Sequence, residues 1–260
     1  MKFYELRKLQ SDLEMIVNLG WIENQRHGND GGIGNTLEDL LGISENNYSL
    51  PDFGNWEIKS QRSKTASLLT LFHFEPEPCD LRVVPRLLLP NYGWPHRNAG
   101  GKYPITEKSF RQTIKATQYT DRGFSIVIDD TLEQIVIDFQ FSLVSDAHRA
   151  WRAEVEEHVG VGALNPSPFW RLGEIRNKLE EKLKNIVYVV ADTKIIGGKE
   201  FFKYLHFEVF MDPSSERFLE LLKGGTIFID FDARTGHNHG TKFRIRRKQL
   251  PQLYQVHVNV

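Results

Sequence analysis

The pattern of hydrophobic and polar residues changes its period along the chain. Over residues 4–19, leucine and isoleucine side chains recur at helical spacing, and Gly20 follows as a stop signal. This pattern predicts a helix. Residues 66–74 are nearly all apolar, which is typical of a buried strand.

The same criteria predict helices and strands through the rest of the chain. Further helices are expected over residues 36–41, 170–183 and 215–222. Further strands are expected over residues 124–129, 134–141, 186–191, 201–210, 226–232, 242–246 and 254–260. This mixture predicts an α/β or α+β fold. Residues 75–104, rich in proline and aromatic residues, are expected to form a functional excursion outside the core, and residues 145–168 are expected to be irregular.

Length and composition exclude several classes of protein. A chain of 260 residues suits one large domain or two intimate lobes. It has no apolar run long enough to span a membrane, and its N-terminus lacks the apolar core of a signal peptide, so a cytoplasmic location is expected. Cys79 is the only cysteine, which excludes an internal disulfide and a cysteine-built zinc site.

The charges balance overall but are unevenly distributed. Lys and Arg number 33 and Asp and Glu 34, so the net charge is −1. This argues against a protein that coats polyanions over its whole surface. Basic residues nevertheless gather without acids in residues 59–64 and 242–248. Because binding follows the local field, these clusters are compatible with a polyanionic partner.

Residues 51–59 carry the most informative pattern. Their sequence, PDFGNWEIK, contains Gly54-Asn55, a favoured two-residue link between antiparallel strands. A turn at these two residues would pair Phe53 with Trp56. The aromatic side chains could then enter the core.

That pairing would set two acids against each other. Asp52 would lie opposite Glu57, with Lys59 on the same face because side chains alternate along a strand. Two like charges at about 5 Å are unfavourable unless something neutralises them. Mg²⁺ would do so through hard oxygen ligands. Lys59 could then orient or deprotonate a water, or stabilise charge on a phosphate.

Two other interpretations of the hairpin remain open. It could be a surface hairpin with a solvated acidic pair and a nearby lysine, since short motifs recur by chance. The two carboxylates could also be a glycosidase acid/base pair, although Lys59 and the basic clusters disfavour that.

The spacing of Pro51-Asp52 and Glu57-x-Lys59 resembles the PD-(D/E)xK nuclease signature. Three further blocks surround it: HGNDGGIGNTLEDLL at 27–41, SLLTLFH at 67–73 and GHNHGTKFRI at 236–245. In this order, the four blocks resemble the MvaI/BcnI family of type II restriction endonucleases, relatives of the mismatch-repair nicking enzyme MutH.

The resemblance implies a fold and an activity. The fold is a restriction-endonuclease-like mixed sheet flanked by helices, with a catalytic lobe and a DNA-recognition lobe forming a cleft. We expect the catalytic lobe around residues 1–75 and the recognition lobe largely in later segments including 225–250. The implied activity is hydrolysis of double-stranded DNA at a short CC-x-GG-like site by a monomer. Its cofactor would be Mg²⁺, one or two ions per active site, with Ca²⁺ binding without supporting cleavage.

The resemblance also assigns roles to catalytic residues. Asp52 and Glu57 would bind the metal and Lys59 would be the catalytic lysine. Glu38 corresponds to the family's helix glutamate near the metal. Glu38 has a structural alternative, because with Asn35 as helix cap it would support that cap reciprocally.

Candidate DNA-reading residues lie near the C-terminus. Arginine and polar side chains read base edges best in the major groove, and the candidates are Arg234, His237, His239 and Arg244. A zinc-binding histidine pair is the alternative, but no third ligand is evident. Arg246, Arg247 and Lys248 would hold phosphates or form a solvated face.

Three further residues are candidates for DNA contacts. His73 ends an apolar stretch and, on the family match, would contact a base, although a structural histidine is the default. Arg62 and Lys64 would contact the DNA backbone or be solvated. The glycine-rich residues 28–34 are not a P-loop and would let the backbone approach DNA or simply allow a turn.

Two alternative functions stay open. One is a MutH-like nicking enzyme that needs partner proteins, and the other is a non-catalytic DNA-binding module on a nuclease fold. A cognate DNA methyltransferase of the same system is expected, though not as a physical partner.

Overall fold

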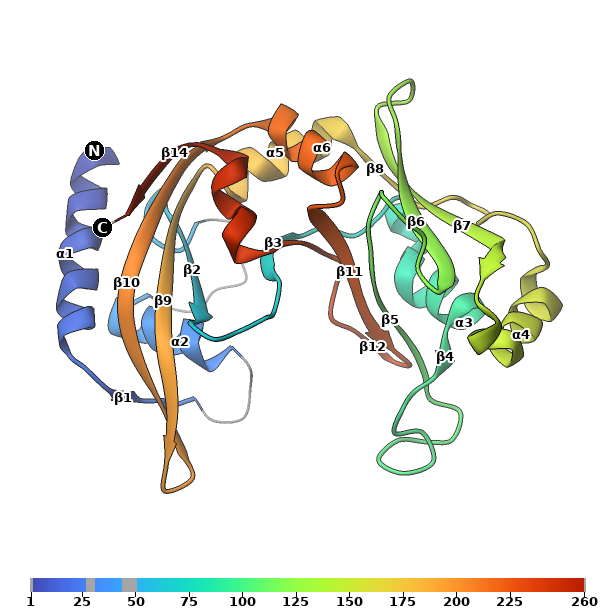
Figure 1. The fold of residues 1–260 in the computed structure, drawn as a ribbon, viewed down its shortest axis with the longest axis horizontal. Helices are drawn as coiled ribbons and strands as arrows, with labels where there is room; N and C mark the ends of the chain where they lie inside the picture. Colours follow the sequence, from blue (N-terminus) through green and yellow to red (C-terminus); the bar gives the residue numbers. More distant parts are fainter. Residues whose placement is uncertain (1, 27–30, 44–50, 260) are drawn as a thin grey trace. The chain divides into compact units, whose positions relative to one another are not determined.

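The structure is a computed structural model that describes residues 2–26, 31–43 and 51–259. The chain divides into two compact units (Figure 1). The first unit contains Met1–Leu69, Lys178–Ser215 and Leu250–Val260, and the second contains Thr70–Asn177 and Glu216–Gln249. Both units combine helices and strands, which confirms the expected α/β fold.

The first unit is built on a five-stranded sheet with helices packed against it. The strand order is β1-β10-β9-β2, and β14 pairs with β10. The strands are β1 (Ile22–Glu23), β10 (Lys199–Pro213), β9 (Asn185–Ile196), β2 (Glu57–Arg62) and β14 (Tyr254–Asn259). β2 is the end strand of this order and runs parallel to β9, whereas the other pairs are antiparallel.

Helices α1 (Lys2–Asn18) and α2 (Gly32–Leu40) cover this sheet (Figure 1). Their apolar side chains, including the fully buried Leu9 and Leu37, form one core cluster with Trp56, Ile58 and the central strands. A third helix, α5 (Leu172–Lys182), begins in the second unit and ends in the first. The side chain of Ile58 therefore anchors β2 in this core.

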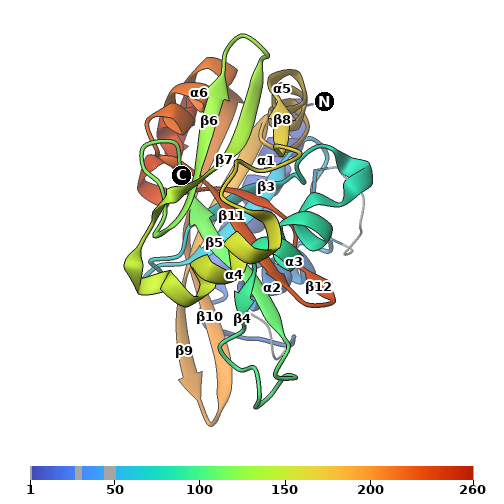
Figure 2. The same ribbon diagram turned by 90° about the vertical axis from the view of Figure 1, so that its right-hand side faces the viewer.

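The second unit contains two sheets (Figure 2). The larger has the order β3-β13-β11-β5-β4, with β12 added on β11, and the smaller has the order β6-β7-β8. The strands of the larger sheet are β3 (Leu69–His73), β4 (Trp94–Pro95), β5 (Lys108–Ile114), β11 (Ile227–Arg234), β12 (His237–Asn238) and β13 (Lys242–Ile245). Those of the smaller sheet are β6 (Arg122–Asp129), β7 (Gln134–Val144) and β8 (Phe169–Arg171).

Helices and aromatic residues complete the second unit. The helices are α3 (Leu89–Tyr92), α4 (Arg149–Val159) and α6 (Ser215–Lys223), and α3 packs against α4. Short 3-10 helices span Cys79–Leu81, Asp146–His148 and Arg247–Leu253, and a π-helix spans Val84–Leu88. Buried rings dominate the core; Phe72 and Phe243, for example, stack at 4.9 Å between centroids.

Most predicted elements are present, and four expectations are wrong. Residues 75–104 are not an excursion, because Val84 and Leu88 are fully buried. Residues 145–168 contain α4 rather than an irregular stretch. Trp170 lies in β8, so α5 begins after it.

The fourth wrong expectation concerns Asn35. Helix α2 already begins at Gly32, with Gly31 as its cap, so Asn35 lies inside the helix. The predicted reciprocal capping role of Glu38 therefore does not apply. The glycine-rich segment continues as helix from Gly32, and its residues 27–30 lie outside the described residues.

None of the helices in the described part of the chain combines the length and apolar character needed to cross a bilayer.

The packing of α1 makes a first prediction. Replacing Leu9, which is fully buried, by Ala should lower the free energy of unfolding by about 2–5 kcal/mol because it leaves a cavity under the sheet. Met15 on the same helix is 59% exposed, so Met15→Ala should change the free energy of unfolding by about 0.5 kcal/mol or less. Urea unfolding measures both. Equal losses would contradict the burial of this helix face.

Candidate active site and nucleic-acid interface

The hairpin before β2 has the predicted register. Phe53 N donates to Trp56 O at 2.9 Å, and Trp56 N donates to Phe53 O at 2.8 Å. Gly54 takes the positive φ of 58° that a two-residue hairpin turn demands at its first central position. Trp56 is 1% exposed and anchors the hairpin in the core of the first unit.

This register brings the three predicted catalytic residues together. The Asp52 carboxylate reaches across the hairpin, and its Oδ2 accepts from Ile58 N at 2.8 Å. Lys59 Nζ donates to Glu57 Oε1 at 3.3 Å. The Lys59 and Glu57 side chains are 12% and 13% exposed, so their charges interact with little screening by water.

The pKa of Asp52 is raised in the folded protein. Burial raises the pKa of Asp52, and the neighbouring charge of Glu57 raises it further, against the lowering effects of the Ile58 N–H, Lys59 and Lys182. The expected electrostatic conflict between the two acids is therefore present. Burial first, and then the charge of Glu57, also raise the pKa of Tyr254 well above its ordinary value.

Lys182 is a neighbour of Glu57 that the sequence did not reveal. It ends α5, and its Nζ lies 3.6 Å from Glu57 Oε2. The two carboxylate oxygens thus face two different lysines. No local motif links Lys182 to the hairpin, because the contact depends on how α5 leads into β9, the strand beside β2.

A cavity of about 320 Å³ lies beside the hairpin. It is lined by Pro51, Asn55 and Glu57 from the hairpin and by Glu180, Glu181, Lys182, Lys184 and Asn185. Asn185 is 2% exposed, and its Nδ2 donates to Asn55 O at 3.0 Å. This contact ties the hairpin turn to the start of β9.

The carboxylates fit a magnesium ion. Glu57 Oε2 is buried and receives no hydrogen bond, although Lys182 Nζ stands 3.6 Å away. In the ranges that the structure describes, no three His, Cys, Asp or Glu residues gather as a metal-binding group. Mg²⁺ is usually bound by one or two carboxylates together with waters and substrate phosphates, so two acids suffice for it.

Glu38 lies on α2, which packs against β2. Its Oε1 lies 4.0 Å from the position that a Cβ on Gly34 would take, and Ser60 Oγ lies 3.4 Å from that position. Ser60 follows Lys59 and therefore points to the opposite face of β2. Glu38 thus lies beside the strand, and its proximity to a metal stays a prediction.

Arg62 and Lys64 lie at the far end of β2. Arg62 Nη2 forms an ion pair with Glu200 Oε1 at 2.9 Å, and Lys64 is exposed. Both line a cavity of about 470 Å³ together with Trp21, Ser63, Thr65, Asp192 and Thr193. The ion pair of Arg62 is formed with Glu200 of β10, and the contacts of Arg62 and Lys64 with the DNA backbone stay a prediction.

Arg234 and Arg244 lie on the polar face of the large sheet of the second unit. Alternate residues of β11 are buried, and the others lie on the polar face. Arg244 Nη1 donates to Asp230 Oδ2 at 2.8 Å, and Arg234 Nη1 donates to Glu107 Oε1 at 3.0 Å. Asp232 lies 3.7 Å from Lys242 Nζ.

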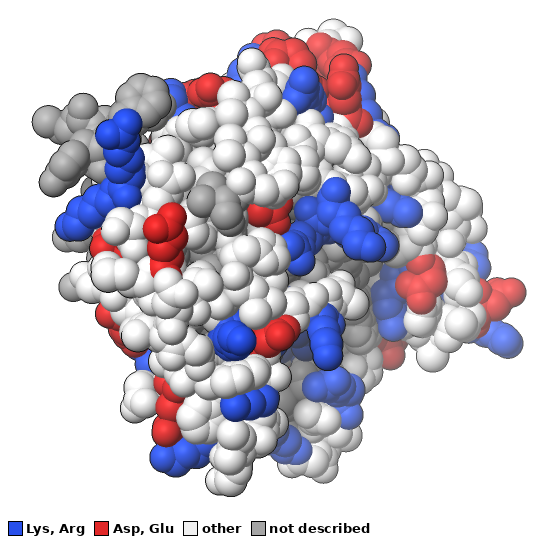
Figure 3. Space-filling model, turned by 60° about the vertical axis from the view of Figure 1, so that its left-hand side comes forward, with Lys and Arg blue, Asp and Glu red and all other residues white. Residues whose placement is uncertain are grey.

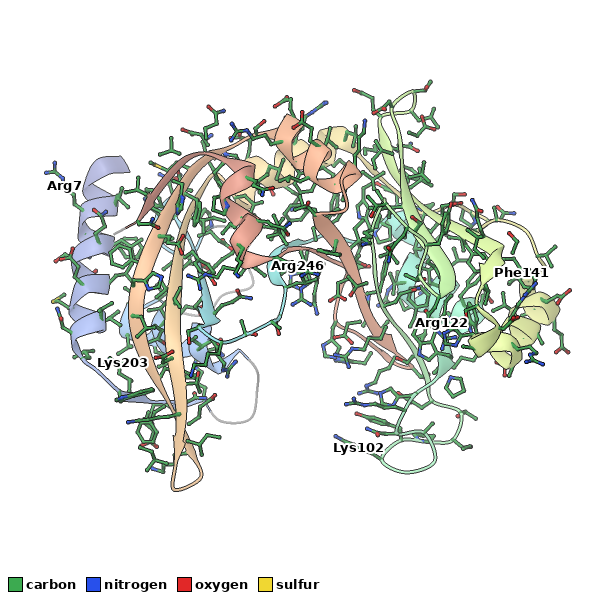
Figure 4. The ribbon with its side chains drawn as sticks, in the orientation of Figure 1. Arg7, Lys102, Arg122, Phe141, Lys203 and Arg246 are labelled. Carbon is green, nitrogen blue, oxygen red and sulfur yellow. The ribbon has the colours of Figure 1, made fainter. Side chains whose placement is uncertain are left out.

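Acidic and basic side chains therefore alternate on this polar face. Asp230 and Asp232 were not candidates in the sequence analysis, although their spacing of two in the predicted strand could have indicated them. Arg246, which follows β13 (Figure 4), is exposed. Across the surface drawn in Figure 3, basic side chains form local groups with acidic ones between them.

The histidines gather at β12 and the turn that connects it to β13. His237 and His239 are exposed, and their ring centroids are 4.2 Å apart. The ring of His73, at the end of β3, comes within 3.2 Å of the position that a Cβ on Gly240 would take. The structure thus brings these three candidates to one turn of the second unit. Among the described residues, these histidines do not form a group of three ligands that could hold a metal ion.

The fold and the acidic hairpin define a class: this is a restriction-endonuclease-like α/β protein. The chain belongs to the MvaI/BcnI restriction endonuclease family, because the model of this family matches residues 10–254.

Solved structures give the same result. The chain resembles the restriction endonuclease MvaI in complex with its cognate DNA substrate, with a TM-score of 0.79, 26% identity, and coverage of 98% of this chain and 97% of that chain. It also resembles MvaI in the absence of DNA, with a TM-score of 0.53, 25% identity and the same coverage of 98% and 97%. No curated protein sequence matches the chain.

The raised pKa of Asp52 predicts a pH-dependent stability difference. A charged Asp52 is penalised in the folded state at pH values above its raised pKa, and the penalty disappears below the ordinary value of 3.8. Asp52→Asn keeps an acceptor for Ile58 N and removes the charge. The variant should therefore melt at a higher temperature than the parent at neutral pH, and the difference should shrink as the pH falls toward 3.8. A difference in melting temperature that does not change with pH would contradict the raised pKa of Asp52.

Proposed function

We propose that this protein is a type II site-specific endodeoxyribonuclease that hydrolyses double-stranded DNA in a Mg²⁺-dependent reaction. One observation carries the proposal: in a member of this family, the hairpin register sets Asp52, Glu57 and Lys59 side by side. These contacts support a PD-(D/E)xK arrangement, in which two carboxylates would supply oxygen ligands and Lys59 an ammonium group.

The carboxylates of Asp52 and Glu57 would hold one or two Mg²⁺ ions. When bound, the metal lowers the pKa of its water and offsets charge on the pentavalent phosphate. Asp52 is preset for this task by its bond from Ile58 N, which fixes one carboxylate oxygen. Ca²⁺ would occupy the same oxygens without supporting cleavage.

The lysines would act on the water and the phosphate. Lys59 would place the attacking water or take its proton, as the water oxygen forms a bond to phosphorus. The bond from phosphorus to the 3′ oxygen then breaks, which leaves a 5′-phosphate and a 3′-hydroxyl. Lys182, 3.6 Å from Glu57 Oε2, adds a second positive charge on the same side. Glu38 would support this centre from the neighbouring helix.

The polar face of the second unit suits G·C base pairs. Arginine donates to the two acceptors of guanine, and a carboxylate accepts from the amino group of cytosine. Arg244 and Asp230 present both kinds of group within 2.8 Å of each other. This supports a short CC-x-GG-like site, read by Arg234, Arg244, His237, His239 and His73, with Arg62 and Lys64 on the backbone.

The proposal includes the setting of the enzyme. Its partner would be double-stranded DNA, and it would act as a monomer in the cytoplasm. A cognate methyltransferase would protect the host DNA without binding this protein.

A partner-dependent nicking enzyme is the second candidate, supported by the relationship of this family to MutH. Plasmid digestion separates the two. Discrete linear fragments made by the protein alone favour the restriction enzyme, whereas cutting that requires a partner favours the nicking enzyme. Tight sequence-selective binding without any cleavage would instead support a non-catalytic module. Sequencing the fragment ends identifies the site and the cut position.

Removing the central groups should abolish cleavage. Lys59→Ala and Asp52→Ala should each lower the single-turnover rate about 100-fold or more, because general acid–base and metal contributions are lost. The rate of plasmid cleavage in Mg²⁺ measures this.

Lys184→Ala is the matched control. Lys184 also lines the cavity, but its ion pair is with Glu180 at 2.5 Å, and both of these side chains are exposed. Its loss should leave the rate nearly unchanged. Cleavage retained in Lys59→Ala would remove the mechanism.

Two arginines of the second unit should behave differently. Arg244→Ala should weaken binding to the cognate site by about 1–3 kcal/mol and relax base choice at one position. Arg246→Ala should weaken binding to all sequences alike and reduce the salt slope of log K by about 1. DNA binding in Ca²⁺ at several salt concentrations measures both effects. The same sequence-independent loss for both variants would contradict the assignment of base contacts to Arg244.

A further inference from the structure

The turn that carries His237 and His239 needs an anchor of its own. Gly236 and Gly240 bracket it with φ values of 73° and 83°, a region that favours glycine. Both imidazoles are exposed, so packing does not fix them. A base contact nevertheless requires that the turn present its side chains in one geometry.

The side chain of Glu75, just beyond β3, supplies such an anchor. Its Oε1 accepts from Thr241 N at 2.8 Å and from Asn238 Nδ2 at 3.3 Å, and its Oε2 accepts from Thr241 Oγ1 at 3.0 Å. The bonds thus come from both sides of Gly240. Asn238 Oδ1 in turn accepts from Gly240 N at 3.1 Å.

Packing and a backbone hydrogen bond fix Thr241, one of the two residues that Glu75 binds. Thr241 is fully buried, and Phe74 N donates to Thr241 O at 2.9 Å, directly before Glu75. Asn238 lies between the two histidines. One carboxylate therefore joins a buried strand start to the partly buried Asn238 at the centre of the histidine turn.

We propose that Glu75 is a positioning residue for sequence recognition, which holds the 237–241 turn so that His237 and His239 meet base edges. The inference rests on the proposed function, because it concerns how the proposed site is read. Glu75 itself contacts no base in this account, since both of its oxygens are engaged by the turn.

Geometry and charge can be separated at this position. In Glu75→Gln, the amide oxygen can still accept from Thr241 N and Asn238 Nδ2. The amide nitrogen can donate to Thr241 Oγ1, whose hydroxyl hydrogen rotates away. Glutamine thus keeps all three bonds and loses only the charge. Glu75→Ala loses all three.

The test is DNA binding in Ca²⁺ by the full chain. The probes are a duplex carrying the cognate site, as identified by fragment sequencing, and the same duplex with one base pair changed. The parent protein should prefer the cognate duplex. Glu75→Ala should lower that preference about 10-fold or more, the worth of a lost base contact, whereas Glu75→Gln should keep it.

Glu77→Ala is the matched control. Glu77 has the same charge two residues further on, and its Oε2 accepts from Cys79 N at 3.2 Å, away from the turn. Its loss should leave the preference unchanged. The imidazole C–H signals of His237 and His239 in NMR spectra give an independent readout, and they should shift in Glu75→Ala and stay in place in Glu75→Gln.

The outcomes are distinct. An unchanged preference in Glu75→Ala overturns the inference, and so does an equal loss in Glu75→Ala and Glu75→Gln, because charge would then be the cause. If Glu75→Ala does not fold, Asn238→Ala removes the bond to Glu75 from the other side, together with the bond from Gly240 N, and should lower the preference in the same direction; no change there overturns the inference. A parent protein without any sequence preference would instead refute the proposed function itself.

Discussion

The candidate active site depends on two backbone hydrogen bonds between Phe53 and Trp56. They close the hairpin so that the residues on either side, Asp52 and Glu57, come together with nothing but a two-residue turn between the strands. Burial of Trp56 fixes the register, because a slip by one residue would turn the indole out of the core and the acids into it. The favourable packing of one aromatic residue thus sustains an unfavourable approach of two charges.

The surrounding structure moderates that conflict without removing it. Lys59 and Lys182 stand at the two oxygens of Glu57, and Ile58 N binds Asp52. The pKa of Asp52 is nevertheless raised, since burial and the charge of Glu57 outweigh these contacts. A site that remains short of positive charge is suited to a divalent ion. Because β2 ends the order of the described strands, one side of the pair has no neighbouring strand among them.

The sequence was informative where the determinants are local. The hairpin followed from Gly54-Asn55, and strand alternation placed the acids and Lys59 on one face. Lys182 could not be inferred, because its approach to Glu57 depends on a tertiary contact of α5. Asn35 looked like a helix cap, yet α2 starts earlier since Ile33 is buried in the core and draws the first turn into the helix. The proline-rich segment was misjudged because its apolar residues have no simple period and still fill the core of the second unit.

Recognition residues share a different constraint. The proposed base-reading residues lie on one polar sheet face and in one turn of the second unit, where carboxylates pair with Arg234 and Arg244. In the proposed function, the first unit cuts the DNA and the second reads its sequence, and cutting depends on the acidic hairpin being a metal site. The most direct measurement is a crystal of the full chain soaked in Mn²⁺, with anomalous scattering used to locate the ion. The account predicts a peak coordinated by Asp52 and Glu57. An ion bound elsewhere, with none at these two carboxylates, would contradict it.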